Sequence, residues 1–308
     1  MASLVRRLAK SVVPRKLRSR IMRSLVPQGD WRGVMDLRGV TDDPVAACYM
    51  AHRSSPVIDV PLSRCIGLQA VGVPFSPAKH PFVGTVGQLR EEADLKYSAS
   101  SLCAYQEAFA PKTMAEVLGL HEICLDSPLA QLPAAAVVLP WWTDREGMAV
   151  MARCANWRRS LEADYRQAGY KPPPEILAPN WFGPGNPAAG QIELERLARL
   201  MRSISTEGLT RHDRPDGDIT GVVLCVSERP PRIMLHSGQH RAAVAAGLGM
   251  DRIPVRLFPA VSSVLIRRDE VLSWPHVRSG LFTSEQALAV FDRLLSGVPS
   301  SGWAADAT

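Results

Sequence analysis

The stretch from residue 233 to 257 constrains the fold of this 308-residue chain more than any other part of it. An apolar run, Ile233–His236, is followed by the turn Ser237–Arg241, an alanine-rich run, Ala242–Gly249, and a second apolar run, Ile253–Leu257. Short apolar runs bounded by turn residues are typical of buried strands, and alanine favours helix. The pattern predicts strand, tight turn, helix and strand.

The turn in the middle of this pattern predicts an anion site. The start of a helix has unpaired backbone N–H groups and the positive end of the helix dipole, and phosphate is the anion most often bound there. Gly238 can adopt positive φ and let a ligand approach the backbone. Arg241 can bind phosphate oxygens with both arms of its guanidinium. His240 alone would more often be structural, but beside Arg241 it favours phosphate binding.

Two further turn residues have open roles. Ser237 is equally suited to capping the helix and to donating a hydrogen bond to phosphate. Gln239 is a candidate to read a base or ribose, although a solvent-facing position in the turn is favoured. We therefore expect nucleotide contacts from Ser237, Gly238, Gln239, His240 and Arg241.

Candidate catalytic carboxylates precede the strand expected at 219–226. Asp216 and Asp218 flank a glycine, and phosphoryl transfer needs a metal ion or base near the transferred phosphate. We expect Asp218 to bind Mg²⁺ or act as a base, with Asp216 as a second catalytic candidate. The alternative, given equal weight, is a glycine turn with two solvated carboxylates.

The order of elements resembles the ParB/sulfiredoxin superfamily over about residues 190–260. A helix at 191–206 ends at Gly208, two strands follow, and the Gly-x-His-Arg box at 238–241 precedes a helix, Leu-Gly and Ile253-Pro-Val. The resemblance implies nucleotide-phosphate binding at the box: ATP in sulfiredoxins, CTP in ParB partition proteins. Free serine kinases of the same fold transfer phosphate to a small hydroxyl compound.

Two departures narrow what the resemblance implies. Gln239 stands where sulfiredoxins carry the catalytic cysteine, so sulfinic-acid repair is not expected. No helix-turn-helix with a basic recognition helix follows residue 260, so DNA binding is not expected either. We expect ATP or CTP binding with Mg²⁺, and an enzyme of this kind would be a phosphotransferase. The alternatives are a non-catalytic nucleotide-sensing or scaffold protein at the membrane surface, and a ParB-like DNA-associated protein.

The positive charge of the chain is concentrated at its start. Eight of the 36 basic side chains fall within residues 1–25, which hold no acid, so 28 remain against 30 acidic residues. Apolar residues at helical spacing predict a basic amphipathic arm over 1–29. Such an arm suits an anionic membrane surface; a solvated terminus, a targeting segment and nucleic-acid binding are alternatives. Six scattered cysteines and no apolar run of about 20 residues favour a cytoplasmic protein, peripheral to the inner face of the membrane if the arm binds lipid.

The predicted fold class is α+β, a mixed α/β domain of ParB/sulfiredoxin type with a largely helical N-terminal region. A Pro- and Gly-rich stretch places a boundary between residues 171 and 190. The sequence leaves the oligomeric state open. The expected segments are the arm, an N-terminal region at 30–180 that is helical in its second half, the ParB/sulfiredoxin-like domain at 185–265, and a helical C-terminal extension at 266–308.

Overall fold

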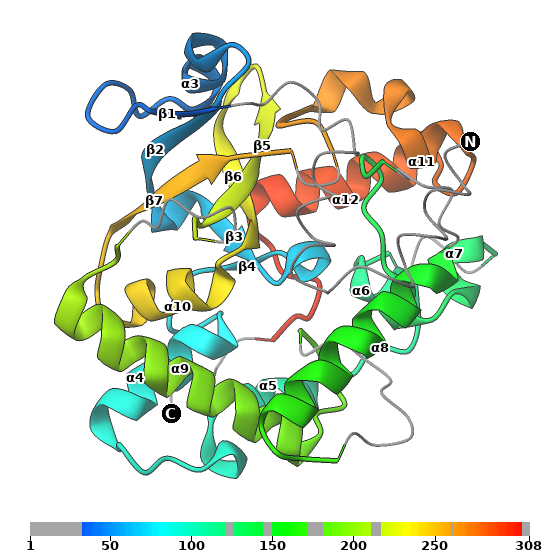
Figure 1. Ribbon diagram of the computed structural model, residues 1–308. Helices are drawn as coiled ribbons and strands as arrows, with labels where there is room; N and C mark the ends of the chain where they lie inside the picture. The colour runs from blue at the N-terminus through cyan, green and yellow to red at the C-terminus, as the bar shows by residue number, and fades with distance from the viewer. Residues whose placement is uncertain are drawn as a thin grey trace, which may run out of the picture.

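A computed structural model gives the fold of most of the chain (Figure 1). Helices and one mixed sheet confirm the α+β class. The basic arm and Asp216 lie outside the described residues. The structure describes residues 33–120, 126–143, 150–171, 181–210, 217–259 and 262–303.

One sheet runs through the molecule in the order β1-β2-β7-β5-β6-β3-β4, with β8 beside β5. The antiparallel hairpin of β5 and β6 lies at its centre, and β7 runs parallel to β5. Strands were expected at 219–226, 232–236 and 253–257, and all three are confirmed. The strands are β1 (Val34–Asp36), β2 (Ser55–Pro61), β3 (Cys65–Gly67), β4 (Val73–Pro74), β5 (Thr220–Val226), β6 (Arg229–Ser237), β7 (Arg252–Leu257) and β8 (Leu265–Arg267).

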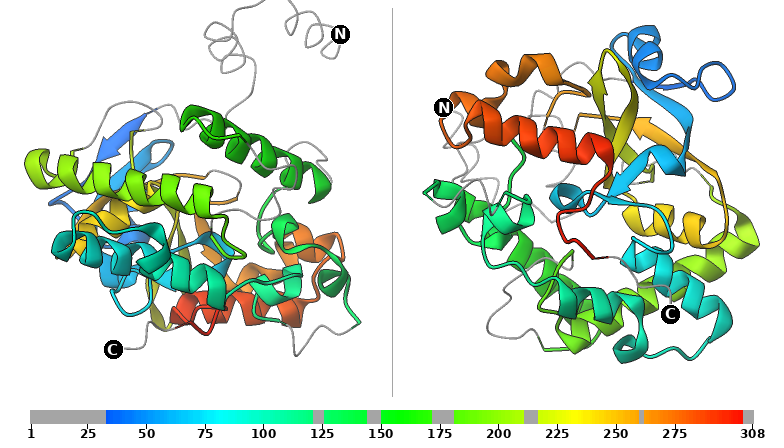
Figure 2. Two further views of the ribbon diagram at one scale, coloured as in Figure 1. Left: turned by 90° about the horizontal axis from the view of Figure 1, so that it is seen from below. Right: turned by 180° about the vertical axis from the view of Figure 1, so that it is seen from behind.

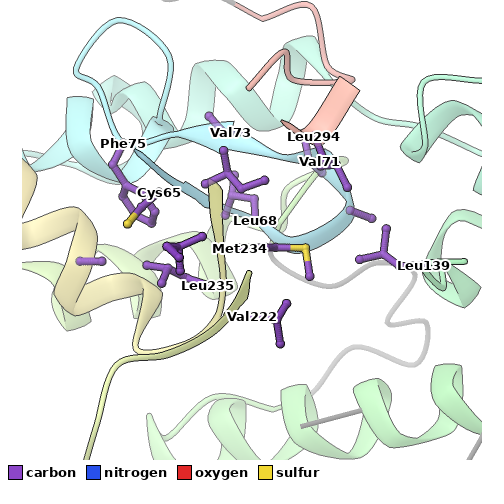
Figure 3. Close-up of a cluster of buried hydrophobic side chains, with 14 of the residues drawn as sticks. Cys65, Leu68, Val71, Val73, Phe75, Leu139, Val222, Met234, Leu235 and Leu294 are labelled. Carbon is purple, nitrogen blue, oxygen red and sulfur yellow. The ribbon is translucent and has the colours of Figure 1, made fainter. Parts of the chain in front are cut away.

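The N-terminal region contributes strands to this same sheet. β2 pairs antiparallel with β7, where Ile58 lies opposite Val255, and β3 pairs parallel with β6, where Ile66 lies opposite Met234. The boundary expected between residues 171 and 190 therefore does not divide the sheet. Figure 3 shows side chains of β3, β4, β5 and β6 meeting in one core. Those labelled there include Cys65, Val73, Val222, Met234 and Leu235.

The helices follow the expected pattern in the second half of the chain. The helix expected at 191–206 is confirmed as α9, which Gly208 ends, and α8 is a long helix in the second half of the region at 30–180. The α-helices are α3 (Pro44–Ala51), α4 (Pro81–Glu91), α5 (Ser101–Ala108), α6 (Met114–Val117), α7 (Pro128–Gln131), α8 (Val150–Gln167), α9 (Pro187–Glu207), α10 (Gln239–Gly247), α11 (Pro275–Arg278) and α12 (Ser284–Ser296). Short 3-10 helices span Leu62–Arg64, Gln69–Val71, Tyr97–Ala99, Ala134–Ala136 and Arg268–Ser273.

Small residues let α10 pack closely against its neighbours. α10 contacts α4 and α9, and Figure 2 shows α9 and α12 on opposite sides of the sheet. Ala242 and Ala245 are fully buried, and a Cβ on Gly247 would lie only 2.4 Å from the Val86 side chain. The alanine-rich run thus fixes α10 between the sheet and two helices. No helix in the described part of the chain is long and apolar enough to cross a bilayer.

Candidate functional site

The start of α10 lies beside the start of β5. Gly238, the N-cap residue, has φ 74°, and a Cβ there would lie 2.9 to 3.0 Å from atoms of Ile219. Only glycine adopts this conformation without strain and fits against Ile219. Among the described residues, no side chain caps α10. The unpaired N–H groups of its N-terminal turn therefore receive no side-chain oxygen from the part of the chain that the structure describes.

Arg241 turns from α10 toward the segment that precedes β5. Its Nη1 donates a hydrogen bond to the carbonyl oxygen of Gly217 at 2.5 Å. Burial lowers the pKa of Arg241, and the negative charge of Asp218 acts in the opposite direction. The guanidinium is thus held at the head of the helix, partly withdrawn from water and close to a carboxylate.

Asp218 is buried rather than solvated. Asp218 is 5% exposed, and its Oδ2 lies 3.7 Å from Nη1 of Arg256 on β7. The interpretation of Asp218 as a solvated turn carboxylate is therefore wrong. A buried carboxylate between two arginines has a fixed position, which a metal ligand or base requires.

Asp218, Arg241 and Arg256 face a common pocket, which we call the α10 pocket. Its volume is about 240 Å³, including its open mouth. Binding sites for drug-sized molecules usually span about 300–1,000 Å³, so this small open recess does not enclose a whole nucleotide and could contact only part of one at its mouth. Among its described lining residues, two guanidinium groups and one carboxylate sum to one net positive charge. The other lining residues are Val57, Leu209, Thr210, Gly217, Ile219 and Pro254.

Arg256 is a pocket residue that the sequence reasoning missed. Its Nη2 donates a hydrogen bond to Ser55 Oγ at 3.3 Å, and its guanidinium lies 4.9 Å from the centre of the Phe258 ring. These contacts hold it on the pocket side of β7. Alternation along the strand was the available signal, because residues 254 and 256 point to the same face of the sheet.

His240 faces away from the α10 pocket. Its Nε2 is hydrogen-bonded to Oε2 of Glu193 on α9, and its ring stacks on Phe82 at 4.8 Å between centroids. Glu193 is 2% exposed and also accepts a hydrogen bond from Arg196 Nη1 at 2.6 Å. His240 thus connects α10 to α9 and α4, and the structure does not bring it together with Arg241 at the pocket.

Gln239 and Ser237 are also outside the pocket lining. Gln239 is 7% exposed, and its Oε1 accepts a hydrogen bond from the backbone N–H of Leu68 at 2.6 Å. The favoured solvent-facing position for Gln239 is therefore wrong. Ser237 is exposed at the end of β6, opposite Thr220.

Two histidines near the site, the buried His80 and the partly buried His236, have lowered pKa values. Neither ring nitrogen of His80 has a hydrogen-bond partner among the described residues, and burial, with the charge of His240, lowers its pKa to about 3. His236 Nε2 lies 2.9 Å from the carbonyl oxygen of Phe258, and its Nδ1 lies 3.1 Å from Thr220 Oγ1. Because a carbonyl only accepts, Nε2 carries the proton and Nδ1 accepts from the threonine. Burial lowers the pKa of His236 as well.

A metal ion at this site would have few protein ligands. In the part of the chain that the structure describes, no group of three or more His, Cys, Asp or Glu residues could hold a metal ion. Mg²⁺ usually keeps several waters and binds through one or two carboxylates plus substrate phosphates. Asp218 fits that limited role.

Comparisons with protein-family models, with curated proteins and with solved structures found no match. The chemistry of the α10 pocket is therefore interpreted from its own geometry.

Proposed function

We propose that this protein binds the phosphates of a nucleotide, ATP or CTP, in the α10 pocket. The observation that carries the proposal is the convergence of Arg241 and Arg256 beside the N-terminus of α10. Two guanidinium groups are complementary to phosphate oxygens in charge and geometry, and one of them, Arg241, extends from the first turn of α10. The base and ribose would lie outside the pocket, because the pocket is a small open recess that does not enclose a whole nucleotide.

Asp218 makes Mg²⁺ part of this proposal. Its carboxylate would repel a bare phosphate that enters the α10 pocket. A nucleotide that arrives with Mg²⁺ turns this repulsion into attraction, because the cation can bridge phosphate oxygens and the carboxylate. Asp218 would then be the Mg²⁺ ligand or base of a phosphotransferase that acts on a small hydroxyl compound.

We extend the proposal to the scaffold. The order β5, β6, α10 and β7, with a glycine turn between β6 and α10, supports a ParB/sulfiredoxin-like arrangement. Thiol chemistry is not part of the proposal, since Gln239 occupies the cysteine position and bonds to Leu68.

Nucleotide binding is tested by thermal unfolding with ATP, CTP and GTP, each with and without Mg²⁺. A ligand at about 100 times its Kd stabilises the folded state by about 2.7 kcal/mol. We expect Arg241→Ala to lose about 1.5–3 kcal/mol of binding free energy, the range for hydrogen bonds to charged groups. Arg90→Ala is the matched control, because Arg90 donates to Gly247 at the opposite end of α10. Equal nucleotide affinity in the two variants would show that the α10 pocket is not the nucleotide site.

Phosphoryl transfer needs a separate test, because binding alone does not require it. We expect nucleotide turnover with Mg²⁺ and loss of that turnover in Asp218→Ala. Binding without turnover in the wild type, unchanged by Asp218→Ala, would contradict the phosphotransferase and leave a nucleotide-sensing module.

A further inference from the structure

Exposed apolar side chains gather at one corner of the molecule, on β1, the turn after it and α3. Figure 1 shows β1 and α3 side by side there. The other large apolar residues exposed in the described ranges are Tyr170, Leu272 and Val298, which lie apart in the chain. We call this corner the β1–α3 patch; its members, 38% to 63% exposed, are Val34, Met35, Val40, Tyr49 and Met50.

The fold leaves this patch uncovered for two reasons. Among the described strands, β1 pairs with β2 alone, so its other edge is open and all three of its residues are exposed. α3 is apolar all round: it buries Ala47 and Ala51 and turns Tyr49 and Met50 outward. An exposed strand edge beside exposed apolar side chains marks an interaction surface.

The chain itself indicates which partner suits the patch. The patch begins at Val34, directly after the segment 1–25 with its eight basic and no acidic residues. The residues between them span at most about 30 Å, so both can contact one surface. Two acidic groups beside the patch are paired with arginines, Asp36 with Arg38 and Asp42 with Arg252, and a third, Asp43, caps α3 by accepting from its backbone N–H groups.

We propose that the β1–α3 patch and the basic segment 1–25 together dock the protein on an anionic lipid surface. The basic residues would supply attraction to the headgroups, and Val40, Tyr49 and Met50 would enter the interfacial layer. A tyrosine suits this layer because its ring is apolar and its hydroxyl polar. Arg267 holds the Tyr49 hydroxyl at 2.9 Å.

Docking in this way would bring the α10 pocket close to the lipid surface. Asp36 of β1 lies opposite Val57 of β2, and Val57 lines the pocket. The docking proposal does not rest on nucleotide binding, because it uses neither Arg241 nor Arg256.

The test is co-sedimentation of the full chain with vesicles of phosphatidylcholine, alone and mixed with phosphatidylglycerol. We expect binding to the mixed vesicles only, weakened on the order of tenfold by the double substitution Tyr49→Ser, Met50→Ser. The matched control is Leu272→Ser, Val298→Ser, which removes equally exposed apolar residues elsewhere and should bind as the wild type does. Deleting residues 1–25 should remove the salt-dependent part of the binding.

A second pair of variants keeps the test independent of folding defects at α3. Val40 and Leu272 are both highly exposed, so Val40→Asp and Leu272→Asp should each fold, and only the former should abolish vesicle binding. Wild-type binding by Val40→Asp and by the double patch variant would overturn the proposal. So would equal binding to both kinds of vesicle, or a dimer that these variants dissociate without changing vesicle binding.

Discussion

Gly238, Gln239, His240 and Arg241 start one helix but contact three different neighbours. Gln239 bonds to the Leu68 backbone, His240 to Glu193, and Arg241 to the Gly217 carbonyl. Successive residues of a helix point about 100° apart, so their side chains do not share one ligand. The box motif predicted a common phosphate site, but Leu68 and Glu193 are 171 and 47 positions away from their partners. No local pattern identifies contacts of that range.

Gly238 should be sensitive to any side chain. Gly238→Ala combines a positive φ with contact to Ile219, and we expect it to lower the free energy of unfolding by about 3 kcal/mol. Gly249→Ala is the control, because Gly249 has φ 81° and open space around it. It should lose about 1 kcal/mol. Urea unfolding measures both, and equal losses would show that the Ile219 contact has no effect.

His80 should make the protein less stable in acid. Its pKa is about 3 in the folded protein, against 6.5 ordinarily. The unfolded chain therefore gains a proton that the folded chain does not. The stability is complete above pH 6.5 and falls as the pH drops toward 3, by up to about 1.4 kcal/mol per pH unit.

His80→Phe removes this titration and keeps an aromatic ring between Phe75 and Phe82. Its free energy of unfolding should fall less steeply between pH 6.5 and 4 than that of the wild type. If the free energy of unfolding had the same pH dependence in the wild type and in His80→Phe, His80 would not be the source of the acid sensitivity.

At the scale of elements, the sequence predicted the helices and strands that carry a signal in their own residues. α12 begins with one such signal, a capping box in which Thr283 and Gln286 each accept from the other's backbone N–H. β1, β3 and β4 have only two or three residues each, and β2 contains two prolines, so their own residues gave only weak strand signals. Their positions depend on partners far along the chain, such as β7 for β2 and β6 for β3.

The contact between α9 and α10 should depend on Glu193. Replacing it by alanine leaves His240 and Arg196 without their buried carboxylate, and we expect a loss of about 3 kcal/mol in unfolding free energy. Glu195→Ala removes an exposed carboxylate on the same helix and should change stability by less than about 0.5 kcal/mol. Chemical denaturation measures the free energy of unfolding of the two variants. Equal values would show that the contact of Glu193 with His240 does not stabilise the protein.

At the scale of the whole molecule, the sheet joins segments that the sequence assigned to different domains. Composition and the proline-rich stretch suggested a boundary, but β2 and β3 complete the sheet on both sides of β5, β6 and β7. We therefore expect a fragment of residues 185–265 to remain unfolded, because β7 and β6 lose their partners β2 and β3. The dispersion of amide chemical shifts in an NMR spectrum of the fragment measures whether it folds, and we expect the narrow dispersion of an unfolded chain. A well-dispersed fragment spectrum would show that the 185–265 segment folds alone.

The most direct test of the central claim compares two arginines of β7. Arg256 lines the α10 pocket, whereas Arg252 is on the same strand but bonds to Asp59 and Asp42 outside it. Calorimetric titration with the Mg²⁺-nucleotide that stabilises the wild type most should show a Kd raised by about 10- to 100-fold in Arg256→Ala, and a wild-type Kd in Arg252→Ala. A wild-type Kd in Arg256→Ala, or no nucleotide binding by the wild type, would contradict the account.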